Sequence, residues 1–135
     1  MAEARIAAQD LRRFVVAAFA SQGVPAADAE AVAGLMVDAD LFGYDTHGVF
    51  RLRQYVDRLR GGGINPTARV ALVTETAATA LVDGDNGLGH LALQCARELA
   101  TQKAAEAGGS AGSGCATAIT PARRRCMSGR RPSAA

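Results

Sequence analysis

The sequence predicts an α/β fold in which helices come first and strands follow. Three stretches before Pro66 repeat apolar residues at helical spacing, and two short β-branched stretches come after them. After Gly108 the chain is rich in Gly, Ser, Ala and Arg and has no apolar periodicity. We therefore expect an N-terminal helical domain over 1–66, the start of an α/β domain over 67–108 and a disordered tail over 109–135.

Two helices with glycine stops open the helical domain. The first runs from about Ala8 to Gln22, because its apolar residues share one face at spacings of three and four: Leu11, Phe14, Val15, Ala18 and Phe19. Gly23 can adopt the left-handed conformation that ends a helix. Pro25 fits the first turn of a second helix, which we expect to reach about Leu41 and to close at Gly43.

The third predicted helix spans about 47–60, with Thr46 as its N-cap and a run of three glycines as its stop. On it, His47, Arg51 and Tyr55 are spaced four apart and share one face. The helix start favours an anion, Arg51 offers a planar fork for a carboxylate, and His47 can exchange a proton with a hydroxyl. We interpret the three side chains as a site for a small 2-hydroxy or 2-oxo acid; a solvated helix face is the alternative.

The next segment changes from helical to strand spacing. Arg69–Thr74 and Thr79–Val82 are predicted strands, and the turn Asp83–Gly87 leads into a helix over Leu88–Ala107. The order of the glycines around this turn is not that of a dinucleotide-binding loop, so a strand–turn–helix corner is favoured. We expect the stretch from Val70 to Val82 to expose unpaired edges, since no further strand is predicted.

Several segments together resemble the malate/L-lactate dehydrogenase family, whose fold is not the usual Rossmann type. The residues that carry the resemblance are Gly23–Pro25 with Asp28–Ala29, Ala39–Val49 with Arg51 and Tyr55, Gly61–Pro66, and Val82–Gly89. They keep the order and approximate spacing of the family over about residues 5–108. The Asp-Thr-His-Gly sequence at 45–48, with the Arg and Tyr that follow, is quite specific.

The resemblance implies an oxidoreductase that transfers hydride between NAD or NADP and a small 2-hydroxy or 2-oxo acid, usually as a homodimer. His47 matches the catalytic histidine of the family, and Thr46 replaces its usual serine. Arg51 matches a substrate-binding arginine that can also supply a proton. We expect Thr46, His47 and Arg51 to be catalytic, and Arg51, His47 and Tyr55 to bind substrate. The resemblance also implies that 67–108 is the incomplete start of the cofactor-binding domain. The cofactor-binding residues are unknown and are expected in the C-terminal part that this chain lacks, and no metal is expected.

The tail departs from the family pattern, whose members are much longer, so we expect this chain to be a fragment that is inactive alone. Read in a shifted frame, 111–122 can encode Trp-Val-x-Val-Arg-His-Ser-Asn-His-Ala-Gly, which fits the family. We therefore interpret 109–135 as the product of a frameshift. The alternative is a small helical binding module whose five tail arginines bind nucleic acid or an acidic partner. Basic tails usually contain Lys, and none follows Lys103, so nucleic acid is the less favoured partner.

Composition excludes several other classes. No apolar run approaches the ~18–20 residues that span a bilayer, and the N-terminus does not have the pattern of a secretory signal. Cys95, Cys115 and Cys126 fit neither a disulfide framework nor a zinc site. Cys95 lies at helical spacing and is interpreted as a core residue. We expect a soluble, cytoplasmic protein with no membrane partner.

Overall fold

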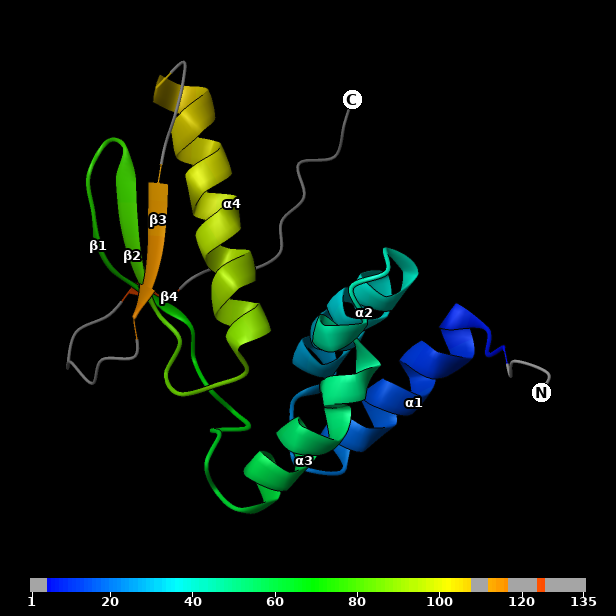
Figure 1. The fold of residues 1–135 in the computed structure, drawn as a ribbon. Coiled ribbons are helices and arrows are strands. Elements are labelled where there is room, and N and C mark those ends of the chain that lie inside the picture. Colours follow the sequence, from blue (N-terminus) through cyan, green and yellow to red (C-terminus); the bar gives the residue numbers. More distant parts are fainter. Residues whose placement is uncertain (1–4, 108–111, 117–123, 126–135) are drawn as a thin grey trace. The chain divides into compact units, whose positions relative to one another are not determined.

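A computed structural model of the chain describes residues 5–107, 112–116 and 124–125 (Figure 1). The chain divides into two units, Met1–Thr67 and Ala68–Ala135. In the described part of the chain, the first unit is helical, and the second has a four-stranded sheet with one helix. This combination of helices and a sheet confirms the predicted α/β class.

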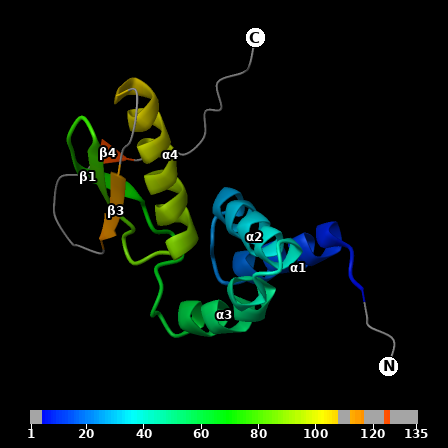
Figure 2. The ribbon, with the colours of Figure 1, turned by 45° about the horizontal axis from the view of Figure 1, so that its top comes forward.

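Residues 5–67 of the first unit form three α-helices and two 3-10 turns: α1 (Ala8–Ala20), α2 (Ala26–Leu41), η1 (Asp45–His47), η2 (Val49–Arg51) and α3 (Leu52–Arg60). The helices α1 and α2 pack against each other (Figure 2). Four large side chains of this pair are fully buried: Val15, Phe19, Val32 and Met36. Burial stabilises the fold by ~1.5–3 kcal/mol for each such side chain, so this helix pair holds the core of the unit.

Each helix of the first unit ends at a glycine with positive φ. Gly23, Gly43 and Gly62 have φ values of 82°, 80° and 71°. After α2, the Gly43 amide donates to the carbonyl three residues before it at 3.0 Å, and the Tyr44 amide donates to Ala39 at 2.8 Å. This pair of bonds is the Schellman motif, in which an L side chain at the glycine position is strained. The predicted stops at Gly23 and Gly43 are confirmed.

The third helix starts later than the sequence predicts. It begins at Leu52 and not near His47, and Thr46 is not its N-cap, because the two 3-10 turns precede it. The break lies at Gly48, whose φ of −86° and ψ of −154° are extended. An extended residue interrupts the helical hydrogen-bond ladder. His47 and Arg51 therefore lie on two short turns and not on one helical face.

The second unit contains β1 (Ala71–Glu75), β2 (Thr79–Asp83), α4 (Gly89–Ala107), β3 (Gly112–Ala116) and β4 (Arg124–Arg125). The strand order is β3-β2-β1-β4. The β1–β2 hairpin is antiparallel and pairs Ala71 with Asp83, whereas β2 and β3 are parallel and pair Leu81 with Gly114. Helix α4 connects the parallel strands and packs against both of them (Figure 1).

The tail supplies both outer strands of this sheet. β3 and β4 lie within the segment that the sequence predicts to be disordered, and they pair with β2 and β1. The prediction of unpaired edges is therefore wrong for β2, whose five residues all pair with β3, and for Ala71 and Leu72 of β1, which pair with β4. A strand edge offers a row of free N–H and C=O groups, which a distant extended segment can satisfy without a strong local sequence signal. The other residues of 109–135, and with them most of the predicted frameshifted stretch, lie outside the described residues.

Small aliphatic side chains form the core between α4 and the sheet. Val82, Cys95 and Ala96 are buried together, and Val70 and Leu99 pack against them. The core position predicted for Cys95 is confirmed. The structure also has Cys95 in a disulfide, so the interpretation that the cysteines fit no disulfide framework is wrong for Cys95. Every Phe and Tyr of the chain lies in the first unit, so this second core contains no aromatic ring.

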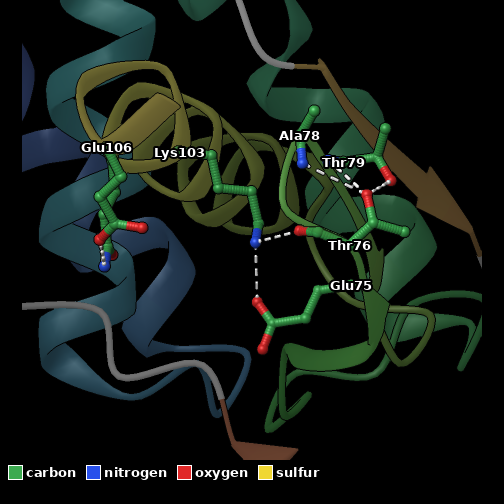
Figure 3. A network of polar contacts seen from close by, with 7 residues as sticks. Glu75, Thr76, Ala78, Thr79, Lys103 and Glu106 are labelled. Carbon is green, nitrogen blue, oxygen red and sulfur yellow. Dashed lines mark hydrogen bonds and ion pairs between the residues drawn. The ribbon is translucent and has the colours of Figure 1, made fainter. Parts of the chain in front are cut away.

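A buried lysine ties the last turns of α4 to the β1–β2 hairpin (Figure 3). Lys103 is only 8% exposed. Its Nζ donates to the Thr76 carbonyl oxygen at 2.7 Å and lies 3.0 Å from Glu75 Oε2. The Thr76 hydroxyl oxygen accepts the Thr79 N–H at 3.0 Å, which closes the hairpin turn. The turn and the helix are thus joined through one charged side chain.

Candidate functional site

The predicted catalytic residues lie on the segment that leaves α2. The His47 amide donates to the Tyr44 carbonyl at 2.8 Å and closes η1, and the Arg51 amide donates to the Gly48 carbonyl at 3.1 Å and closes η2. Thr46, His47 and Arg51 are all exposed. The two short turns therefore present these three residues at the surface, where a ligand can reach them.

Thr46 joins the other two residues by direct contacts. Thr46 Oγ1 lies 3.0 Å from His47 Nδ1, and Arg51 Nε donates to the Thr46 carbonyl oxygen at 2.8 Å. Arg51 Nη1 also donates to Gln54 Oε1 at 3.0 Å, a contact that the sequence analysis missed. Within the described part of the chain, these bonds use Nδ1 of His47 and two nitrogens of Arg51. Nε2 of the imidazole and Nη2 of the guanidinium are left for a ligand.

The hydroxyl of Thr46 suits both neutral forms of the His47 ring. A hydroxyl can donate or accept a hydrogen bond. When it donates to Nδ1, the proton of the neutral ring is on Nε2; when it accepts from Nδ1, Nε2 has a free lone pair. Thr46 can therefore orient His47 either as a proton donor or as a proton acceptor at Nε2.

Asp40, in the last turn of α2, is a further part of this site that the sequence analysis missed. Its Oδ2 accepts the Val49 N–H at 3.0 Å. Its carboxyl group also fills the space beside Gly48, because a Cβ at that position would lie 1.6 Å from Asp40 Oδ1. A carboxylate at the C-terminal end of a helix opposes the helix dipole. That unfavourable position is the sequence signal that could have pointed to a partner elsewhere.

Tyr55 lies in the helical packing of the first unit. Its ring centroid is 6.5 Å from that of Phe19 on α1, with an angle of 51° between the rings. Tyr55 is half-buried, and Phe19 is fully buried. The predicted stripe of His47, Arg51 and Tyr55 on one helical face is wrong, because the first two lie on 3-10 turns. Hydrogen bonds link Thr46, His47 and Arg51, whereas the Tyr55 ring contacts α1.

An open pocket of about 550 Å³ lies beside Arg51. Its lining residues come from η2 and α3: Phe50, Arg51, Arg53, Gln54, Asp57 and Arg58. Three guanidinium groups against one carboxylate make this lining cationic, and the ring of Phe50 adds an apolar wall. Such a lining suits a small organic anion, because guanidinium groups bind carboxylates and related anions through charge-assisted hydrogen bonds.

The turn between β2 and α4 does not fit the pyrophosphate of a nicotinamide dinucleotide. Asp83 Oδ1 accepts the Asp85 N–H at 2.8 Å, and Asp85 Oδ2 accepts the Arg69 N–H at 2.9 Å. Asp85 and Asn86 both have positive φ, 50° and 52°, as in a tight turn. The amides of Arg69 and Asp85 are thus used by carboxylates, whose negative charge would repel phosphate. The corner is a strand–turn–helix junction, as the sequence predicts.

Metal clusters and membrane-spanning helices are both absent from the described residues. These residues hold no cluster of three or more His, Cys, Asp or Glu side chains that could bind a metal ion. None of the helices that the structure describes is both long enough and apolar enough to cross a membrane.

Known proteins resemble this chain over most of its length. A model of the family described as malate/L-lactate dehydrogenase matches residues 6–118. The L-sulfolactate dehydrogenase of Methanocaldococcus jannaschii is 41% identical over 97 residues, which cover 72% of this chain and 28% of that protein. The malate dehydrogenase of Pyrococcus abyssi is 41% identical over 104 residues, covering 77% of this chain and 29% of that protein.

Solved structures show the same relationship. The malate dehydrogenase from Pyrococcus horikoshii OT3 superposes with a TM-score of 0.73 at 39% identity, over 78% of this chain and 30% of that one. The delta1-piperideine-2-carboxylate reductase from Pseudomonas syringae has a TM-score of 0.69 at 28% identity, over 78% of this chain and 32% of that one. The chain therefore spans about 30% of the length of the relatives that it matches.

Proposed function

We propose that this chain supplies the substrate-binding and proton-transfer residues of a 2-hydroxy-acid dehydrogenase. The chain belongs to the malate/L-lactate dehydrogenase family, whose model matches residues 6–118. The observation that carries the proposal is the pair of contacts through which Thr46 holds His47 and Arg51 together. The proposed reaction interconverts a small 2-hydroxy acid and its 2-oxo acid, with NAD or NADP as the hydride carrier.

In this proposal Arg51 binds the substrate carboxylate and His47 handles the proton. The guanidinium is held by Thr46 and Gln54, so its remaining N–H groups have a fixed direction and can grip a carboxylate. In the oxidation direction, His47 Nε2 takes the proton of the 2-hydroxyl; in reduction, it returns a proton to the oxo oxygen. Thr46 orients the ring through Nδ1 in both directions.

The bound nicotinamide supplies or accepts the hydride in such a reaction. The corner between β2 and α4 does not fit its pyrophosphate, and we assign no hydride step to the residues described here. What we assign to this chain is substrate binding and proton exchange at His47 Nε2.

The pocket beside Arg51 supports a substrate with two anionic groups. Malate carries two carboxylates, and sulfolactate carries a carboxylate and a sulfonate; relatives of this chain are named for both compounds. Arg53 and Arg58 line the same pocket as Arg51. We propose that Arg51 holds the carboxylate next to the reacting carbon, and that Arg58 or Arg53 receives the second anion.

We also propose that the protein works as a homodimer. Support comes from large apolar side chains that are between 67% and 80% exposed around the site: Leu41, Phe42, Tyr44 and Phe50. A group of exposed aromatic side chains is typical of a surface that contacts further protein. Sedimentation of the chain at several concentrations tests this part of the proposal, and a monomer at every concentration would contradict it for the chain as given.

The experiment for the site is a titration of the 135-residue chain with L-malate, oxaloacetate and sulfolactate, followed by NMR at the His47 ring and at the Arg51 Nε–H. Only two histidines are present, so the ring signals are readily assigned. We expect both groups to shift together in a saturable manner. Oxidation of NADH or NADPH in the presence of oxaloacetate, measured in parallel, reports whether the chain also catalyses the reaction.

Variants separate binding from proton exchange. Arg51→Gln should weaken the affinity by roughly 10- to 100-fold, because a charge-assisted hydrogen bond contributes ~1.5–3 kcal/mol. Arg13→Gln removes an exposed arginine of α1 that is outside the pocket lining, and it is the matched control. Thr46→Val should change the His47 ring signals, whereas Thr46→Ser should not, because serine keeps the hydroxyl. If malate and sulfolactate shift neither His47 nor Arg51, the proposed site is wrong.

A further inference from the structure

We propose that Asp40 is a positioning residue for this site. Its carboxylate fixes the joint between the two 3-10 turns, which is Gly48, and so holds His47 and Arg51 around Thr46. The role of Asp40 in catalysis rests on the function proposed above, because Asp40 acts through those residues. Its effect on their geometry does not depend on any ligand.

The first observation is the hydrogen bond that Asp40 accepts across the loop. Asp40 is half-buried in the last turn of α2, and its Oδ2 receives the N–H of Val49, nine residues later, at 3.0 Å. Val49 is the first residue of η2. The N–H groups at the start of a helical turn have no partner within the turn, and a side-chain carboxylate that accepts one stabilises the start. Asp40 therefore caps the turn that carries Arg51.

The second observation is the fit between Asp40 and Gly48. The φ of Gly48 is −86°, which is outside the positive region that favours glycine. A Cβ there would nevertheless lie 1.6 Å from Asp40 Oδ1 and 2.3 Å from its Cγ. Glycine is thus needed at this position for the space that the Asp40 carboxyl occupies and not for a positive φ. The joint can approach α2 only because Gly48 has no side chain.

The third observation is what the joint does to the carbonyl of Thr46. In a continuous helix, the Thr46 carbonyl would accept the N–H of Phe50, four residues later. With the break at Gly48, the same oxygen accepts Arg51 Nε at 2.8 Å. A continuous helix would also stack His47 and Arg51 one turn apart. The bond from Arg51 to the Thr46 carbonyl therefore depends on the break at Gly48, beside which the Asp40 carboxyl group lies.

The test uses NMR on the full 135-residue chain and needs no ligand for its main measurement. Asp40→Ala should speed the exchange of the Val49 amide roughly 10- to 100-fold, as expected for loss of a bond to a charged acceptor, and should shift the His47 ring and the Arg51 Nε–H. Asp40→Asn keeps an acceptor oxygen, so it should retain most of the protection of the Val49 amide and leave the His47 and Arg51 signals at their wild-type positions. Asp38→Asn removes an exposed carboxylate from the same helix and is the matched control.

Two further variants keep the test decisive if Asp40→Ala does not fold. Asp40→Glu keeps the charge but moves the carboxyl group by one methylene, and it should behave like the alanine variant and not like the asparagine variant. Gly48→Ala should produce the same shifts at His47 and Arg51 in the wild-type chain. In the Asp40→Ala background, Gly48→Ala should cause smaller further shifts of the His47 and Arg51 signals, because the carboxyl atoms that the new Cβ would meet are gone.

Binding completes the test of positioning. The dissociation constant for malate should rise by about tenfold in Asp40→Ala and Asp40→Glu, recover in Asp40→Asn and stay unchanged in Asp38→Asn. An unchanged Val49 exchange rate and unchanged His47 and Arg51 signals in both Asp40→Ala and Asp40→Glu would overturn the proposal. So would equal effects of the Asp38 control. A wild-type chain that binds no malate overturns the proposed function, but the unliganded measurements still decide the role of Asp40 in the geometry.

Discussion

Replacement of Lys103 by methionine should loosen the second unit and leave the first intact. Methionine keeps an unbranched apolar stem in the buried position but removes the ammonium group. The Thr76 carbonyl then loses the donor at 2.7 Å, and Glu75, whose side chain is 43% exposed, returns to solvent. A hydrogen bond from a charged donor contributes ~1.5–3 kcal/mol, and we expect a loss of that size. Lys103→Ala also removes three buried methylenes and should destabilise by about 2 kcal/mol more.

The assay has to report on the second unit alone. Both tyrosines lie in the first unit, so tyrosine fluorescence follows that unit and serves as an internal control. Amide hydrogen exchange of β1 and β2 reports on the second, where the loss corresponds to exchange that is roughly 10- to 100-fold faster. Arg97→Met, at a side chain that is 72% exposed on the same helix, is the matched control. If Lys103→Met speeds exchange no more than Arg97→Met does, the Lys103 contacts between α4 and the hairpin do not stabilise the second unit.

The remaining predictions concern two glycines, one ring and the coding DNA. Gly34→Ala should stabilise the first unit by ~0.5–1 kcal/mol in urea unfolding, because alanine favours a helix and its Cβ would meet only the flexible end of Arg12 at 3.4 Å; a destabilised variant would contradict this. Gly62→Ala should destabilise by ~1–2 kcal/mol, since φ there is 71°; an unchanged midpoint would refute the strain. Phe19→Ala should lower stability by ~3–5 kcal/mol by opening a cavity, measured by the same unfolding experiment, and a loss below 1 kcal/mol would argue against a packed core. Sequencing the gene tests the frameshift hypothesis: another frame past Gly108 must continue into a dehydrogenase-like chain.

The helices and their ends were predictable because they depend on local sequence. The apolar stripe of α1 and the glycines at 23 and 43 act within one or two helical turns, and the structure has both helices where expected. The predicted stripe also included Phe14, which is 62% exposed. Spacing alone shows which residues share a helix face, but it cannot show how much of that face a neighbouring helix covers. The strands β1 and β2 follow from their β-branched residues within two residues at each end.

The features that sequence reasoning missed depend on residues far apart in the chain. A continuous helix through 46–52 is locally reasonable, and the break at Gly48 arises from a carboxylate eight residues earlier on another helix. The sequence nevertheless singled out Thr46, His47 and Arg51 by residue type, and hydrogen bonds join these three residues in the structure. The strands β3 and β4 were missed for the same reason as the break: their partners, not their own composition, make them strands.

The position of β3 and β4 on the two outer edges of the sheet has a consequence for the chain during synthesis. The edge of β2, and the first two residues at the edge of β1, are covered by segments that leave the ribosome later, and the second of these segments, β4, follows Asp83 by roughly forty residues. At ~5–20 residues per second, the nascent hairpin waits a few seconds before its second edge can be covered. Over that interval it is open to pairing with a neighbouring nascent chain, and a chaperone that shields extended backbone would raise the yield of folded protein.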